Sequence, residues 1–194
     1  MPYGRRQYHP IFAAAERHGL AVGIHAGTSH LSAPTAIGWS SSFLADYAAF
    51  STIAEGQLMS LIVEGVFTKF PGLKVVFMET GFMWYPAFIW RADKTWRGVR
   101  QEIPWVKVPP SEVAEAHVRF TLQPVDAPPT PDDIARMLDH IGSERMLLFS
   151  SDYPHWHYDG FEALPPGFPD NLVQRVLVDN PLETYPRLAE EVTP

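Results

Sequence analysis

The sequence predicts an α/β fold built on a parallel sheet of four strands. Four short apolar runs, each suited to a strand buried on both faces, alternate with stretches of helical spacing. No Asn-Gly or Asp-Gly turn joins any two consecutive runs, so each connection is expected to be a right-handed crossover through a helix. The runs are residues 20–25, 73–79, 117–123 and 146–149. Four such units make half of an eight-stranded barrel or a small doubly wound sheet.

Helix signals fill the intervals between these runs. Apolar residues at helical spacing predict one long helix over about residues 43–70, in which Gly56 and Gly65 weaken the pattern. Ser111 is expected to cap a later helix by accepting a backbone N–H. The remaining helices are expected over residues 10–18, 85–103, 132–140 and 171–178, with a last one from Pro181.

Composition argues against several classes of function. The net charge is -7 and no basic patch stands out, so nucleic acid and anionic membrane are not expected partners. No apolar run approaches the roughly 18–20 residues of a spanning helix, and nothing at Met1 reads as a signal peptide, so the cytoplasm is expected. Zero cysteines exclude disulfides, thiolate zinc sites and a cysteine nucleophile. A small molecule is the expected substrate.

Side chains able to do chemistry lie where the predicted strands end. His25 closes the first run, Glu79 closes the second, and Asp152 follows the fourth. The carboxyl ends of parallel strands meet at one face, so a separation of 152 − 25 = 127 residues does not prevent contact. An imidazole with a carboxylate is a ligand set for zinc, manganese or iron. Simpler interpretations are a histidine bonded to backbone, a turn aspartate bonded to nearby amides, and an ion pair of Glu79 with Arg91.

The residues after Asp152 extend this set. His155 and His157 flank Trp156 in a His-x-His pattern, whose two rings share a face only in an extended chain. Because the pattern follows Pro154, a substrate contact through His155 is favoured over paired metal ligation.

Tryptophans near these positions are candidate walls of a pocket. Trp84 and Trp156 suit a flat or apolar ligand, although the helical spacing of Trp84, Trp90 and Trp96 is also typical of a core. The chain contains neither a glycine-rich phosphate loop nor a Gly-x-Ser-x-Gly elbow. The strand-end histidine and carboxylates are therefore the main chemical signal.

Four motifs together resemble a known family. They are residues 24–27 (IHAG), 67–76 (FTKFPGLKVV), 150–155 (SSDYPH) and 178–182 (VDNPL). They are similar to the amidohydrolase-related group of the amidohydrolase superfamily, which includes aminocarboxymuconate-semialdehyde and resorcylate-type decarboxylases. The resemblance implies a TIM-type (β/α)₈ barrel with one divalent metal at its C-terminal rim. It implies His25 as the fifth-strand metal ligand and Asp152 as the eighth-strand carboxylate that holds the metal or its water.

The sequence departs from this family in two places. Nothing before His25 matches the paired ligands of the first strand, and the sixth-strand position reads Glu79-Thr80-Gly81 where relatives carry His-Gly-Gly. Glu79 or Thr80 therefore replaces the histidine that would polarise the substrate. We expect residues 1–194 to form a single domain, the C-terminal half (about four βα units) of the barrel, which lacks the N-terminal strands.

These observations predict a metal-dependent hydrolase or non-oxidative decarboxylase that acts on a small carboxylic or aromatic acid. His25 and Asp152 are expected to bind one divalent metal, Zn²⁺ or else Mn²⁺, and Asp152 and Glu79 to be catalytic. The expected substrate contacts are His155, Trp84 and Trp156. Two alternatives stay open: a relative that binds a small ligand without turnover, and a truncated chain with no function of its own. The open sheet edges of half a barrel also predict a homodimer.

Overall fold

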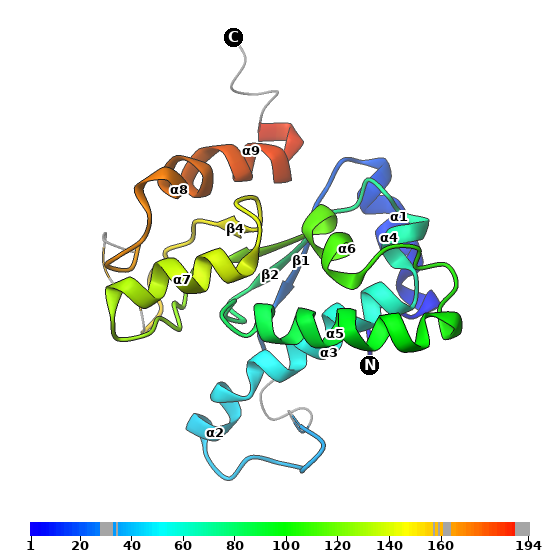
Figure 1. Ribbon diagram of the computed structural model, residues 1–194, viewed down its shortest axis with the longest axis horizontal. Coiled ribbons are helices and arrows are strands. Elements are labelled where there is room, and N and C mark those ends of the chain that lie inside the picture. The colour runs from blue at the N-terminus through cyan, green and yellow to red at the C-terminus, as the bar shows by residue number, and fades with distance from the viewer. Residues whose placement is uncertain (28–32, 34, 157, 159, 161–163, 189–194) are drawn as a thin grey trace.

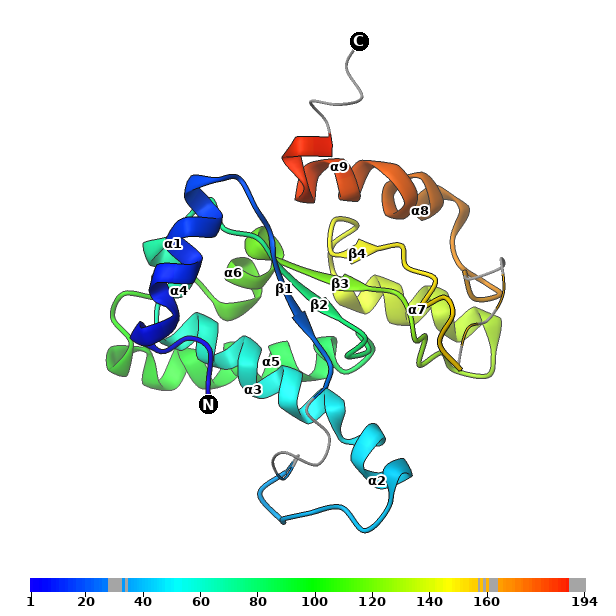
Figure 2. The same ribbon diagram turned by 180° about the vertical axis from the view of Figure 1, so that it is seen from behind.

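The computed structural model describes residues 1–27, 33, 35–156, 158, 160 and 164–188 of the 194-residue chain. Its centre is a parallel sheet in which each strand pairs with the next one in the sequence, in the order β1-β2-β3-β4 (Figures 1 and 2). The strands are β1 (Val22–His25), β2 (Val75–Met78), β3 (Val118–Thr121) and β4 (Leu147–Leu148). This confirms the predicted α/β class, a parallel sheet of four strands alternating with helices.

The sheet register brings the carboxyl ends of the strands to one edge. His25 at the end of β1 pairs with Met78 of β2, and Thr121 at the end of β3 pairs with Leu148 of β4. All three strand pairs are parallel. The residues that follow the strands are therefore gathered at the same rim, as parallel topology requires.

The two longest helices are α3 (Phe50–Val63) and α5 (Tyr85–Val99), which lie side by side in both views (Figures 1 and 2). Phe120 of β3 is fully buried and joins the sheet to α5. Its ring lies 5.3 Å from Tyr85 and 5.5 Å from Trp84, and it stacks on Phe77 of β2 at 5.7 Å. The near-continuous apolar character of the strands follows from this burial.

The other helices are short. They are η1 (Arg6–Tyr8), α1 (His9–Arg17), α2 (Phe43–Ala48), α4 (Val66–Lys69), η2 (Arg100–Glu102), α6 (Pro110–His117), α7 (Pro131–Ile141), α8 (Asp170–Gln174), η3 (Arg175–Asp179) and α9 (Asn180–Thr184). None of the helices in the described part of the chain is long and apolar enough to cross a membrane.

The single helix expected over residues 43–70 is wrong, because this stretch folds as α2, α3 and α4. The chain leaves α3 just before Gly65, which has φ +73. A Cβ atom at Gly65 would lie 2.6 Å from the Trp105 side chain. Backbone conformation and this close approach both select glycine there, whereas Gly56 continues within α3.

Three further boundaries differ from the prediction. Helix α5 ends at Val99 and the expected extension to residue 103 is largely the turn η2, while His117 belongs to α6 rather than to β3. Ser111 does not cap α6, since that helix begins at Pro110. Instead, the Ser111 N–H and hydroxyl donate to the Asp93 carboxylate of α5 at 2.9 and 2.6 Å.

The two edges of the sheet are finished differently. At the β4 edge, the Phe149 N–H donates to the Val176 carbonyl at 3.2 Å, and the Asn180 side-chain amide donates to the Leu147 carbonyl at 2.8 Å. The C-terminal helices therefore cover this edge (Figure 2). At the opposite edge, β1 has no strand partner other than β2 among the described residues.

Candidate active site

Each of the four strands leads to one ionisable side chain at the carboxyl-end rim. His25 ends β1, Glu79 follows β2, Asp126 lies in the loop after β3, and Asp152 follows β4. Glu79 and Asp152 have positive φ values, +56 and +57, which are uncommon for residues with a side chain. Positive φ at such residues is held by the surrounding structure and is frequent at functional sites.

His25 and Glu79 form the central contact of the rim. The His25 Nε2 atom lies 2.8 Å from Glu79 Oε1, and its Nδ1 atom is bonded to the Ala26 carbonyl. Both neighbours are hydrogen-bond acceptors, so the doubly protonated imidazolium is the form that satisfies them both. Partial burial lowers the pKa of His25, but the Ala26 carbonyl and the carboxylates of Glu79 and Asp152 outweigh it and leave the pKa raised.

Glu79 is oriented toward His25 by its own strand neighbour. The Glu79 N–H donates to Thr121 Oγ1 of β3 at 3.2 Å, which ties the turn after β2 to the adjacent strand. The alternative interpretation, an ion pair of Glu79 with Arg91, is not found among the described residues. The Glu79 carboxylate therefore lies at the rim, beside His25.

Asp152 and His155 form a second histidine–carboxylate contact. Asp152 Oδ2 lies 3.2 Å from His155 Nδ1, and the Asp152 side chain is only 6% exposed. The His155 N–H donates to the Asp152 backbone carbonyl at 2.7 Å, and the Tyr153 N–H donates to Ser151 Oγ at 3.4 Å. The backbone N–H groups of His155 and Tyr153 therefore donate to acceptors other than the Asp152 carboxylate. The simpler interpretation, in which this carboxylate binds the amides of its own turn, does not explain its position.

Two residues that the sequence analysis missed complete the rim. Burial, together with the carboxylates of Glu79, Asp152 and Asp126, raises the pKa of Tyr47 to about 12. The Tyr47 ring lies 6.0 Å from the ring of Trp156. Asp126 obeys the same rule as the other carboxylates, because it lies in the loop that follows a strand. The signal for Tyr47 was its helical spacing with other aromatic residues of 43–50.

The predicted substrate contacts lie in different surroundings. The partly buried Trp84 donates its indole N–H to the carbonyls of Thr80 and Gly81, 3.1 Å from each, so it fastens the turn after β2. Trp156 is 71% exposed at the rim. Substrate contacts by His155, Trp84 and Trp156 stay predictions, and His157 of the His-x-His pattern lies outside the described residues.

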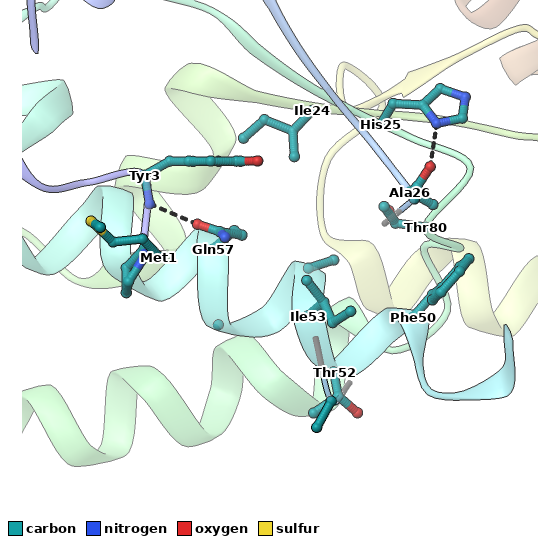
Figure 3. A pocket seen from close by; sticks show the side chains of 15 residues that line it. Met1, Tyr3, Ile24, His25, Ala26, Phe50, Thr52, Ile53, Gln57 and Thr80 are labelled. Carbon is teal, nitrogen blue, oxygen red and sulfur yellow. Dashed lines mark hydrogen bonds between the residues drawn. The ribbon is translucent and has the colours of Figure 1, made fainter. Parts of the chain in front are cut away.

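A cavity of about 520 Å³ opens beside His25 (Figure 3). The end of β1 and the first half of α3 form its walls, and Met1 and Tyr3 lie at the side away from His25. The Tyr3 N–H donates to Gln57 Oε1 at 2.8 Å and joins the N-terminal segment to α3. A volume of several hundred Å³ is typical of sites for small molecules.

Comparison with known proteins identifies the family of this chain. The sequence model described as amidohydrolase matches residues 1–187. The chain belongs to the amidohydrolase family. This confirms the resemblance carried by the strand-end motifs. The comparison with curated proteins finds no match.

Solved structures show the same fold over nearly the whole chain. An amidohydrolase from Mycobacterium avium subsp. paratuberculosis K-10 is 27% identical with a TM-score of 0.70, and the match covers 94% of this chain and 46% of that one. The 5-carboxyvanillate decarboxylase of Sphingomonas paucimobilis is 23% identical with a TM-score of 0.68, covering 96% and 55%. A dihydroxybenzoic acid decarboxylase from Polaromonas sp. JS666, with bound manganese and the inhibitor 2-nitroresorcinol, is 16% identical with a TM-score of 0.69, covering 100% and 58%.

The chain therefore spans about half the length of the solved amidohydrolase-fold structures it matches. Its parallel four-stranded sheet corresponds to part of a TIM-type barrel, as predicted.

The donor chemistry of the amidohydrolase rim fits a divalent metal, but the donor number does not complete a site. Imidazole and carboxylate are ligands for zinc and manganese. Within the described residues, no group of three or more His, Asp or Glu side chains is arranged to hold a metal ion. The Nε2 atom of His25 also faces Glu79 rather than open space. A metal bound by His25 and Asp152 would need further ligands and would have to compete with the His25 proton.

Proposed function

We propose that this chain supplies half of the active site of a metal-dependent hydrolase or non-oxidative decarboxylase of the amidohydrolase family, acting on a small carboxylic or aromatic acid. The proposal rests on the convergence of His25, Glu79 and Asp152 at one rim, with His25 Nε2 and Glu79 Oε1 2.8 Å apart. The family assignment supports enzymatic chemistry. The carboxyvanillate and dihydroxybenzoate decarboxylases among the solved structures support the aromatic acid as the substrate class.

The proposed roles follow from the contacts at the rim. His25 and Asp152 would hold one divalent ion, Zn²⁺ or Mn²⁺, together with ligands beyond the described residues. Such an ion supplies Lewis-acid polarisation or an activated water when bound. Glu79 stands within proton-transfer distance of His25 and is placed to accept or return a proton. His155 orients the Asp152 carboxylate and, with the exposed Trp156, lies where a substrate would approach.

Metal content tests the ligand assignment. A complete barrel that contains this chain, dialysed against micromolar Zn²⁺ or Mn²⁺ and then against buffer, is expected to retain about one ion per molecule by elemental analysis. His25→Ala and Asp152→Ala should each lose the ion, whereas His140→Ala on α7 should retain it. A wild-type barrel without metal, or a metal content that neither His25→Ala nor Asp152→Ala changes, would contradict the assignment.

Activity in a complete barrel tests the role of Glu79. Glu79→Gln keeps the size of the side chain and removes its charge, so metal should be retained while turnover of hydroxybenzoate substrates, measured as released CO₂, falls by at least about 100-fold. Turnover unaffected by Glu79→Gln would remove Glu79 from the chemistry. Hydrolysis of an amide or ester panel without CO₂ release would assign the hydrolase reaction instead.

A second candidate is binding of a small acid without turnover. The observation in its favour is that Glu79, and not the histidine of relatives, occupies the position beside His25 and engages its Nε2 atom. Calorimetry that finds tight ligand binding, combined with no product in a metal-supplemented assay, would support this candidate. Measurable turnover would eliminate it.

We further propose that the chain forms a homodimer through the uncovered edge of β1. An unpaired strand edge offers backbone donors and acceptors to a second strand. Exposed apolar side chains lie near this edge, including Tyr3 and Ile11, which line a cavity along β1 with Gly23 and Ile24. Light scattering with size-exclusion chromatography should give twice the chain mass of 21.8 kDa. A monodisperse monomer would contradict the proposal.

A further inference from the structure

A second cavity, of about 460 Å³, lies on the outer side of α3 and α5, away from the His25 cavity. Its walls come from the second half of α3, one side of α5, η2 and the start of α6. The first half of α3 lines the His25 cavity instead, so the two cavities lie along different halves of one helix. We call this second space the α3–α5 cavity.

The walls of the α3–α5 cavity are almost entirely apolar. They include the side chains of Met59, Val63, Phe88, Trp96, Val99 and Ile103. A cavity of this size with aromatic and aliphatic walls and a small number of polar groups matches the usual form of a small-molecule site. Two aromatic rings in the wall favour a flat, apolar ligand.

The charged side chains that line the α3–α5 cavity are Arg91 and Glu102, and neither is in an ion pair among the described residues. Outside the lining, the Arg100 guanidinium lies over the Trp96 ring, 5.6 Å from its centroid. An arginine without an ion-pair partner beside an apolar space can hold the carboxylate of a ligand.

The Trp96 side chain provides an independent sign of an incomplete site. Its Nε1 atom is shielded from solvent and has no acceptor within the described part of the chain. A buried donor without an acceptor is unfavourable and is uncommon in folded proteins. A ligand oxygen beside Trp96 would give this donor a partner after a small rotation of the indole.

We propose that the α3–α5 cavity binds a small aromatic carboxylic acid, with its ring against Phe88 and Trp96 and its carboxylate at Arg91. This site is separate from the rim of His25 and Asp152 and goes beyond the proposed catalytic function. It places a second acid-binding site on the outer surface of the same half-barrel, connected to the first through α3.

A matched pair of probes tests the proposal by calorimetry. The wild-type chain is expected to bind 3-phenylpropionate more tightly than the neutral 3-phenylpropionamide, because only the acid can pair with Arg91. Arg91→Gln should weaken binding of the acid about five-fold and leave the amide unchanged, since an exposed ion pair contributes a modest amount. Glu102→Gln should strengthen binding of the acid, because it removes a like charge.

Two further variants distinguish this cavity from the rim. Thr95→Trp places a large ring in the mouth of the α3–α5 cavity and should weaken binding of both probes at least ten-fold. His25→Ala should leave their binding unchanged. Loss of binding in His25→Ala with retention in Thr95→Trp would assign the acid to the rim and overturn the proposal, as would equal affinity for acid and amide. Arg91→Gln and Glu102→Gln replace exposed side chains and keep the test valid if Thr95→Trp does not fold.

Discussion

Replacing Gly81 by alanine should destabilise the protein through two separable effects. Gly81 has φ +67, in the left-handed region where a Cβ atom crowds the following carbonyl oxygen at a cost of about 1–2 kcal/mol. A Cβ atom at this position would also overlap Oδ2 of Asp126, so the rim carboxylate would have to move. We expect the free energy of unfolding to fall by about 1–2 kcal/mol from the backbone effect, with a further loss from the displaced carboxylate.

Two other glycines provide matched controls. Gly142 ends α7 with φ +76, and no atom of the described residues lies within 4 Å of its would-be Cβ, so Gly142→Ala measures the backbone effect alone. Gly98 lies within α5 and also faces open space. Alanine there should raise the free energy of unfolding by about 0.5–1 kcal/mol, because glycine is the poorer helix former.

Urea unfolding followed by circular dichroism compares the three variants. The expected order of stability is Gly98→Ala, wild type, Gly142→Ala and then Gly81→Ala. Equal losses for Gly81→Ala and Gly142→Ala would show that Asp126 moves at no cost. A Gly81→Ala variant as stable as the wild type would refute the conformational argument itself.

Three other perturbations have defined outcomes. Burial, together with nearby cations, lowers the pKa of His117 below its ordinary 6.5. The unfolded chain therefore takes up the proton first, and stability is lost as the pH falls through about 6.5. His117→Gln should reduce the difference in unfolding free energy between pH 7.5 and 5.5, and an unchanged difference would contradict this explanation. Glu183 pairs with Arg145 at 2.8 Å and with Arg175 at 3.2 Å near the surface. Glu183→Gln should therefore lower the free energy of unfolding by about 0.5–1 kcal/mol in low salt and by less in 0.5 M NaCl. A loss that does not depend on salt would refute the ion-pair explanation. Phe120→Ala should lower the free energy of unfolding in urea by about 3–5 kcal/mol, because it removes a fully buried ring. A loss below about 1 kcal/mol would mean that the core between the sheet and α5 is loosely packed.

Much of the fold was predictable because each strand satisfies a local rule. The segment 73–79 is apolar almost throughout, as expected for a strand covered on both faces, and β2 lies within it. The absence of hairpin turns required crossovers, and crossovers require parallel strands. Parallel strands then place His25 and Glu79 at the same rim, although the direct contact between the two side chains could not be predicted from the sequence.

Other features depended on distant partners and were not readable locally. Gly56 and Gly65 weaken the same helical pattern, and the break falls at Gly65, where Trp105 packs against it. Ser111 has the residue type of a helix cap, but Asp93 on another helix takes both of its donors. In each case a contact between elements outweighs a local preference.

The sequence by itself determined the four parallel strands, their alternation with helices and the family to which the chain belongs, because apolar spacing and strand-end motifs are local properties of the chain. Only the tertiary structure decided which polar groups meet. The hydrogen bond of His25 to Glu79 joins residues 54 positions apart, and the approach of Tyr47 to three carboxylates joins α2 to the turns after three strands. These contacts depend on sheet register and on side-chain direction, which are fixed when the core packs and are encoded in no single segment.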